Sequence, residues 1–216
     1  MTETWVVFGA TGQQGGAVAR ILLQDKAVSV RAAVRDPSSP SGATLRDLGC
    51  ELVRADLDDK DSLRVALEGA SGVFVVTSND VDETYYEREF AQGKNAADAA
   101  VEAGVKRIIF STLPSVKNVT NGLEQYIRQL PIDGAFIALG AFMSNFATFL
   151  RSQEAGDGSF VIKSSMPGST SLPLVDATDI GRAVATISRD FDKFRGRTIN
   201  LAAELKTLDE VAEMSL

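Results

Sequence analysis

The chain has no histidine among its 216 residues and only one cysteine, Cys50. Without histidine it cannot assemble a Ser-His-Asp or Cys-His catalytic site, and a histidine-ligated metal site is excluded as well. A single cysteine forms neither an internal disulfide nor a structural zinc site, and it fits a reducing compartment. Any chemistry must therefore depend on carboxylates, hydroxyls, lysines, backbone amides or a bound cofactor.

Basic surfaces and long apolar runs are scarce too. The net charge is −7 and the isoelectric point about 4.7, so direct binding to nucleic acid or to an anionic membrane is not expected. No apolar run approaches the roughly 20 residues that span a bilayer. The N-terminus also lacks the basic and then apolar segments of a signal peptide. We expect a cytoplasmic protein, or one that also enters the nucleus.

Short apolar runs alternate with amphipathic segments over the first 110 residues. The spacing predicts strands at 5–8, 28–34, 51–55, 72–76 and 107–110, with helices at 17–23, 62–67 and 87–103 and a helix start at 36–40. Strands separated by helices indicate βαβ units, because parallel neighbours need a crossover. The fold class is therefore α/β, with a Rossmann-type, doubly wound, mainly parallel sheet.

After residue 110 the pattern loosens. It predicts a helix at 123–130, a strand at 135–139, a hairpin or short strand at 156–162, a helix at 176–187, a strand at 198–201 and a last helix that Thr207 and Glu210 open with a capping box. We expect a Rossmann domain over residues 1–140. Residues 141–216 would form a small, incomplete C-terminal α/β lobe that packs on this domain and shares part of its core.

A glycine-rich loop lies directly between the first predicted strand and the first predicted helix. Its first glycine permits a tight turn, the second lets a pyrophosphate come close, and the third lets helix and strand pack. The helix N-terminus then offers free amides to the phosphates. The alternative is that these glycines serve only a turn. The predicted cofactor-binding residues here are Gly9, Ala10, Thr11, Gly12, Gln13, Gln14 and Gly15.

The end of the second strand bears on the choice of cofactor. An acidic residue there would hydrogen-bond the ribose 2′-hydroxyl of NAD, whereas an arginine accommodates the 2′-phosphate of NADP. Arg35 leaves the strand first and can pair with a phosphate, although Asp36 beside it could offset that preference. We predict NADP(H) as the preferred cofactor, with NAD(H) as the alternative. Arg35 could also be a solvated surface charge.

Two further strand ends should face the cofactor, because ligands bind at the carboxyl edge of such a sheet. Asp56 and Leu57 follow the third strand and could contact the adenine, although Asp56 could instead cap a helix or lie in solvent. Thr77, Ser78 and Asn79 follow the fourth strand and could line the path to the nicotinamide, or form a plain polar turn.

A proton-transfer pair of the short-chain dehydrogenase type, Tyr-x-x-x-Lys, is missing. Four residues after the three tyrosines, Tyr85, Tyr86 and Tyr126, stand Glu89, Phe90 and Leu130. Two hydroxyls, Ser111 and Thr112, end the fifth strand and could assist a reaction, but they have no visible partner and fit plain strand-end polar groups. A proton transfer through Lys117, in a predicted loop, has little support. The sequence predicts cofactor binding and no catalytic residue.

Several segments together resemble the NmrA-like family, a group of atypical short-chain dehydrogenases. The resemblance runs from Thr4 to about Met214, and its segments are 9–16 (GATGQQGG), 34–37 (VRDP), 55–59 (ADLDD), 110–116 (FSTLPSV) and Asn118. It implies NAD(P) binding without the active tyrosine. It also implies regulation through protein partners, such as a GATA-type transcription factor, with nucleotide occupancy as the input. The resemblance further places Phe142, Met143, Ser144 and Asn145 near the nicotinamide; an aromatic helix packed on the core is the alternative.

We therefore predict an NADP(H)-binding redox sensor that regulates transcription without dehydrogenase turnover. The alternative is an NADPH-dependent reductase similar to quinone or isoflavone reductases. Two departures from the family bear on this choice. Members usually have a longer stretch between the positions that match Gly122 and Leu123, with a lysine near the cofactor, and they continue well past the helix at Thr207. The sequence is thus either a shortened form, with part of its substrate side missing, or one from which residues have been left out.

Overall fold

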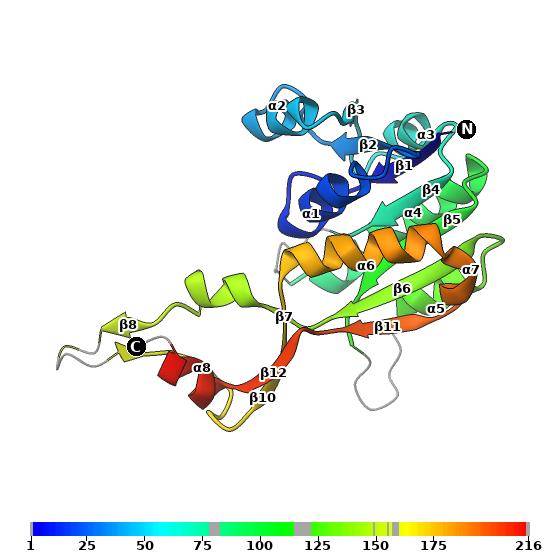
Figure 1. The fold of residues 1–216 in the computed structure, drawn as a ribbon. Coiled ribbons are helices and arrows are strands. Elements are labelled where there is room, and N and C mark those ends of the chain that lie inside the picture. Colours follow the sequence, from blue (N-terminus) through cyan, green and yellow to red (C-terminus); the bar gives the residue numbers. More distant parts are fainter. Residues whose placement is uncertain are drawn as a thin grey trace.

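A computed structural model describes residues 2–77, 83–114, 122–148, 150–154, 156 and 160–214. Its main feature is a seven-stranded parallel sheet with the strand order β11-β6-β5-β4-β1-β2-β3 (Figure 1). The order reverses between β1 and β4, as in a doubly wound Rossmann sheet. The strands are β1 (Glu3–Val7), β2 (Val28–Val34), β3 (Glu51–Arg54), β4 (Gly72–Val75), β5 (Arg107–Thr112), β6 (Asp133–Leu139) and β11 (Thr198–Leu201).

Helices connect these strands, and polar side chains mark where several of them begin. Ser39 accepts a hydrogen bond from the backbone of Gly42, and Asp59 accepts one from Ser62, so both occupy N-cap positions. The helix start predicted at 36–40 is confirmed. The helices are α1 (Gln13–Leu22), α2 (Pro40–Asp47), α3 (Lys60–Leu67), α4 (Tyr85–Glu102), α5 (Gly122–Arg128), α6 (Ala177–Arg189), α7 (Phe191–Phe194) and α8 (Leu208–Met214).

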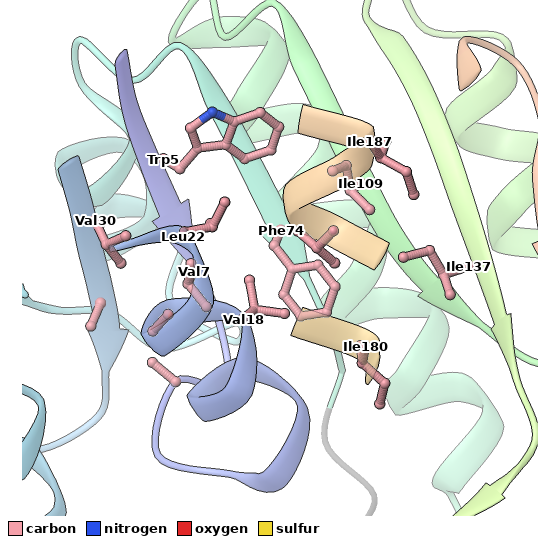
Figure 2. Packing of buried hydrophobic residues seen from close by; sticks show 14 of the residues in the cluster. Trp5, Val7, Val18, Leu22, Val30, Phe74, Ile109, Ile137, Ile180 and Ile187 are labelled. Atoms are coloured by element: carbon pink, nitrogen blue, oxygen red, sulfur yellow. The ribbon is translucent and has the colours of Figure 1, made fainter. Parts of the chain in front are cut away.

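Both faces of the sheet are covered. Helices α1, α2 and α6 bury one face, and α3, α4 and α5 bury the other. Figure 2 shows the first of these cores, in which Trp5 and Phe74 are fully buried between the strands and α1 and α6. Gly181 of α6 lies so close to α1 that a Cβ atom there would come 2.6 Å from the Ala17 carbonyl oxygen. A full core on each face makes the sheet a rigid support for the loops at its carboxyl edge.

The remaining elements form a small lobe beside the sheet (Figure 1). In it β10 (Ser171–Val175) pairs antiparallel with β12 (Glu204–Thr207) and parallel with β7 (Ala141–Phe142). A short antiparallel pair joins β8 (Gln153–Glu154) to β9 (Phe160–Val161). Residues 141–216 serve both units, because α6 and β11 belong to the main sheet and its cover. The Thr207–Glu210 capping box opens α8 as predicted.

The aromatic segment after β6 is not the core-packed helix that we considered as an alternative. Phe142 lies in β7, where it pairs with Val175 of β10. Residues Met143–Ala147 form only a short 3₁₀ helix, η1, and none of them is buried. The pairing with β10 holds Phe142 in an extended conformation, and a single tight turn offers no face wide enough to cover the core. No helix of the described ranges is long and apolar enough to cross a membrane.

Candidate functional site

The glycine-rich loop lies where the strand order reverses, between the carboxyl ends of β1 and β4. Gly9 has a φ of +63°, and a Cβ atom there would come 2.6 Å from Cγ1 of Val76. At Gly15 a Cβ atom would come 2.4 Å from the Gly9 carbonyl oxygen. These two glycines are required by the protein's own packing. At Gly12 the backbone is extended and the nearest atom is 3.3 Å away, so the missing side chain there leaves room for a ligand.

The N-terminus of α1 has free hydrogen-bond donors. Its N-cap residue, Gly12, has no side chain that could accept from the first-turn amides, and this turn contains no acidic residue. The amides of residues 13–15 therefore have no partner within the helix and point along its positive dipole end. Such an arrangement favours a phosphate group.

The two glutamines of the loop connect α1 to neighbouring elements. The Ser144 hydroxyl lies 2.7 Å from Oε1 of Gln13, and the Ser111 hydroxyl lies 2.8 Å from Oε1 of Gln14. In both pairs the serine donates and the amide oxygen accepts. The loop is thereby tied to η1 on one side and to β5 on the other, which fixes its position at the sheet edge.

Three pockets follow one another along the carboxyl edge of the sheet. The β2–β3 pocket, of about 510 Å³, is lined by Arg35, Asp56 and Leu57 among others. The loop pocket, of about 330 Å³, is lined by residues of the glycine-rich loop together with Phe142 and Asn145. The β5 pocket, of about 110 Å³, lies at the ends of β4, β5 and β6. All three share Val76 and Thr77, so they are contiguous.

Most of the residues predicted from the sequence meet in these pockets. Those that line them are Gly9, Thr11, Gly12, Gln13, Gln14, Gly15, Arg35, Asp56, Leu57, Thr77, Phe142 and Asn145. Ala10 is buried beneath the loop, and neither it nor Met143 or Ser144 is among the described lining residues. Ser78, Asn79 and Lys117 lie outside the described residues.

Arg35 and Asp36 have different environments although they are neighbours. The Asp36 carboxylate accepts hydrogen bonds from the backbone and the hydroxyl of Ser38, which hold the pKa of Asp36 below its ordinary value. Arg35 is exposed at the rim of the β2–β3 pocket, and no hydrogen bond or ion pair links it to another described residue. The guanidinium is thus available to a ligand, while the carboxylate is already engaged in its own turn.

Asp56 does not cap α3, as one of the sequence alternatives had it. Asp59 takes that position, whereas Oδ1 of Asp56 accepts from the backbone of Asp58 at 3.1 Å. Two polar side chains that the sequence did not indicate, Arg88 and Gln92 of α4, also line the β2–β3 pocket. Helical periodicity shows that α4 has a buried face. It does not show which turn of α4 reaches the ends of the strands, so these side chains could not be predicted.

The β5 pocket gathers hydroxyl groups around one carboxyl group. Tyr85 and Glu89 reach it from α4, and Ser111 and Thr112 reach it from β5. Glu89 forms hydrogen bonds with Tyr85 and with Thr77. Burial raises the pKa of Glu89 above its ordinary value, although these hydrogen bonds act in the opposite direction. Glu89 stands four residues after Tyr85, at the position that a lysine occupies in the Tyr-x-x-x-Lys pair.

The comparison with family models decides the family. The model of the NmrA-like family matches residues 1–215. The chain belongs to the NmrA-like family. The resemblance inferred from the loop and strand-end motifs is thereby confirmed, and so is the Rossmann-type α/β fold. Within the described residues, no group of three or more cysteine, aspartate or glutamate side chains could hold a metal ion.

Proteins similar to this chain in sequence or structure include two named as an oxidoreductase or a reductase and one named as a transcriptional regulator. The NmrA-like family domain-containing oxidoreductase hkm9 of Aspergillus hancockii is 31% identical, with 97% of this chain and 70% of the relative covered. NmrA, a negative transcriptional regulator solved in complex with NADP, is 26% identical with a TM-score of 0.83, over 97% of this chain and 69% of NmrA. Triphenylmethane reductase of Citrobacter sp. is 26% identical with a TM-score of 0.79, over 98% of this chain and 74% of the reductase.

Proposed function

We propose that this member of the NmrA-like family binds NADP(H) along the three contiguous pockets and uses it to reduce a small acceptor in the β5 pocket. The observation that carries the proposal is the continuity of these pockets past the α1 N-terminus, with a carboxyl group and several hydroxyls at their far end. The oxidoreductase hkm9 and triphenylmethane reductase, both similar to this chain, support the same reaction class.

Each pocket has groups suited to one part of the dinucleotide. The amides at the start of α1 would hold the diphosphate. Arg35 would pair with the 2′-phosphate of the adenosine ribose, and Leu57 would pack against the adenine. The nicotinamide end would then lie toward the β5 pocket, beside Phe142 and Thr77. When bound, NADPH supplies a hydride for the reduction of an acceptor.

Arg35 is expected to select NADP over NAD. Replacing Arg35 with alanine should weaken NADP⁺ binding about 30-fold, equivalent to about 2 kcal/mol for a lost charge-assisted hydrogen bond. Binding of NAD⁺, which lacks the 2′-phosphate, should change by less than about threefold, within the scatter of surface substitutions. Calorimetric titration of both nucleotides measures this. Arg54→Ala, an exposed arginine at the end of β3, is the control. Equal losses for NADP⁺ and NAD⁺ would contradict the assignment.

NADPH oxidation in the presence of candidate acceptors tests the reductase proposal. The purified protein is incubated with NADPH and a panel of aldehydes, ketones, enones and quinones, and NADPH oxidation is followed by its absorbance. We expect turnover with at least one acceptor, and at an NADPH concentration near the wild-type Kd the Gly12→Asp variant should show far less because it binds the nucleotide more weakly. If the protein binds NADPH by calorimetry but turns over no acceptor in the panel, the reductase proposal fails.

A second candidate is a nucleotide-responsive regulator without turnover. Its support is the structural likeness to NmrA, together with the missing Tyr-x-x-x-Lys pair. In that role NADP(H) occupancy would change the affinity for a protein partner, such as a GATA-type transcription factor. A pull-down with such a factor, with and without NADP⁺, tests it. A nucleotide-dependent change in capture supports the regulator, and identical capture in both conditions argues against it.

A further inference from the structure

The β5 pocket contains one carboxyl group, that of Glu89, among the described lining residues. Glu89 lies one turn after Tyr85 on α4, and both side chains line the pocket. Glu89 accepts hydrogen bonds from Tyr85 and Thr77 and is half-buried. Two neighbouring residues with hydroxyl groups, Ser111 and Thr112, line the same pocket from the end of β5. A carboxyl group and several hydroxyl-bearing residues thus line one small volume.

Thr112 gives a second, independent indication that a ligand binds here. Its side chain is 4% exposed, and its hydroxyl has no hydrogen-bond partner in the described part of the chain. A buried hydroxyl without a partner costs about 1–3 kcal/mol, so such groups usually have a role. Thr112 also lines the β5 pocket, and because its hydroxyl has less than 1 Å² of exposed area, the side chain must rotate for this hydroxyl to bind the oxygen of a molecule that enters there.

We propose that Glu89 is the proton donor of the reduction, with Tyr85 as the residue that positions its carboxyl group, and that the acceptor is a small aldehyde, ketone or quinone whose carbonyl oxygen binds near Thr112. The inference rests on the proposed reductase function and names the residue that replaces the missing Tyr-x-x-x-Lys pair. The volume of about 110 Å³ admits a carbonyl group with its immediate substituents, and Leu139 and Phe142 form the apolar walls.

The proposed reduction adds a hydride and a proton to the carbonyl group of the acceptor. The acceptor carbon gains a hydride, with two electrons, from NADPH, and the carbon–oxygen π bond breaks toward the oxygen. The Glu89 carboxyl group gives its proton to that oxygen and becomes a carboxylate. A proton from water restores the acid, and an aldehyde or ketone yields an alcohol and NADP⁺. A quinone first yields a hydroxydienone, which becomes the hydroquinone when the added hydrogen leaves the ring carbon as a proton and the second carbonyl oxygen takes up a proton from water. Burial favours the neutral acid that this step requires.

The central test compares Glu89→Gln with the matched control Glu87→Gln. Glu87 lies on the same helix but is exposed and lines none of the three pockets in the described structure. The glutamine amide at position 89 can still bond with Tyr85 and Thr77, so the fold should be kept. We expect Glu89→Gln to lower kcat at least about 100-fold, as for the loss of a general acid, with NADPH affinity unchanged. Glu87→Gln should match the wild type.

A pH profile separates a proton donor from a structural residue. The wild-type kcat should fall as the pH rises through the Glu89 pKa, because the reactive acid form is lost, and Glu89→Gln should remove this limb. Tyr85 is the one other titratable group of the described pocket lining, and Gln14, Ser111 and Thr112 carry no charge that could titrate here. Burial and the nearby Glu89 charge raise the pKa of Tyr85 above its ordinary value, which keeps it protonated at these pH values.

A readout that needs no turnover completes the test. Carbon-13 NMR of the nucleotide-free protein should show a glutamate carboxyl that titrates above the ordinary range for glutamate, because burial raises the pKa of Glu89, and this resonance should be missing in Glu89→Gln. If the wild type is active and Glu89→Gln keeps its kcat and pH profile, the assignment of Glu89 is wrong although the reductase function stands. If the wild type binds NADPH and reduces nothing, both proposals fall.

Discussion

Replacing Gly12 with aspartate is expected to weaken NADP⁺ binding at least about 100-fold, or about 2.7 kcal/mol, without unfolding the protein. Aspartate is a preferred N-cap residue, so its carboxylate would accept from the first-turn amides of α1 and should stabilise the fold by a few tenths of a kcal/mol. The same carboxylate would occupy the donors that a phosphate needs and would repel its charge. Stability and binding should therefore change in opposite directions.

Calorimetry gives the affinity and urea unfolding gives the stability of this variant. Gly12→Asn is the matched control, because asparagine caps as well as aspartate but carries no charge. We expect it to lose less affinity than Gly12→Asp. The extended backbone at Gly12 suits residues other than glycine, unlike that at Gly9, and a Cβ atom there would come 3.3 Å from the Gly9 carbonyl oxygen, which requires only a small shift. Unchanged affinity in Gly12→Asp would show that the phosphates do not bind at the α1 N-terminus.

Replacing Phe74 with alanine is expected to cost about 3–5 kcal/mol of folding free energy, the usual loss for a buried phenylalanine. Phe74 is 0% exposed and lies in β4 at the centre of the core beneath α1 and α6 (Figure 2). A domain of this kind is stable by only about 5–15 kcal/mol, so the loss is a large share of the total.

The urea midpoint measures the effect of the Phe74 substitution. Val65→Ala is the control, since Val65 is 56% exposed on α3 and should change stability by less than about 0.5 kcal/mol. Phe74 is not among the described lining residues of the three pockets, so nucleotide binding should weaken only as the folded fraction falls. A loss below 1 kcal/mol would mean that the core around Phe74 is much looser than described.

The strands and the glycine-rich loop could be predicted because their signals are local. Apolar runs of four to seven residues bounded by turn residues identified β1 to β6, and the glycines stood directly between β1 and α1. Positions at the ends of parallel strands meet at one edge by geometry alone. That rule placed Arg35, Asp56 and Thr77 together without any knowledge of their contacts.

The failures concern features that depend on tertiary contacts. The aromatic helix that we considered as an alternative for residues 142–145 does not form, because Phe142 pairs with β10 instead. Glu89 and Arg88 reach the pockets only because α4 docks with its first turns at the sheet edge, an orientation that no periodicity specifies. The Tyr-x-x-x-Lys pattern also does not indicate Glu89, although a glutamate one turn after Tyr85 on the helix can hydrogen-bond with it.

Titration of the wild-type protein with NADP⁺ by calorimetry tests most directly whether the carboxyl edge of the sheet is a dinucleotide site. We predict saturable binding of one NADP⁺ per chain, tighter than that of NAD⁺ because of Arg35. No detectable binding of either nucleotide at millimolar concentration would contradict the proposed site and the functions built on it.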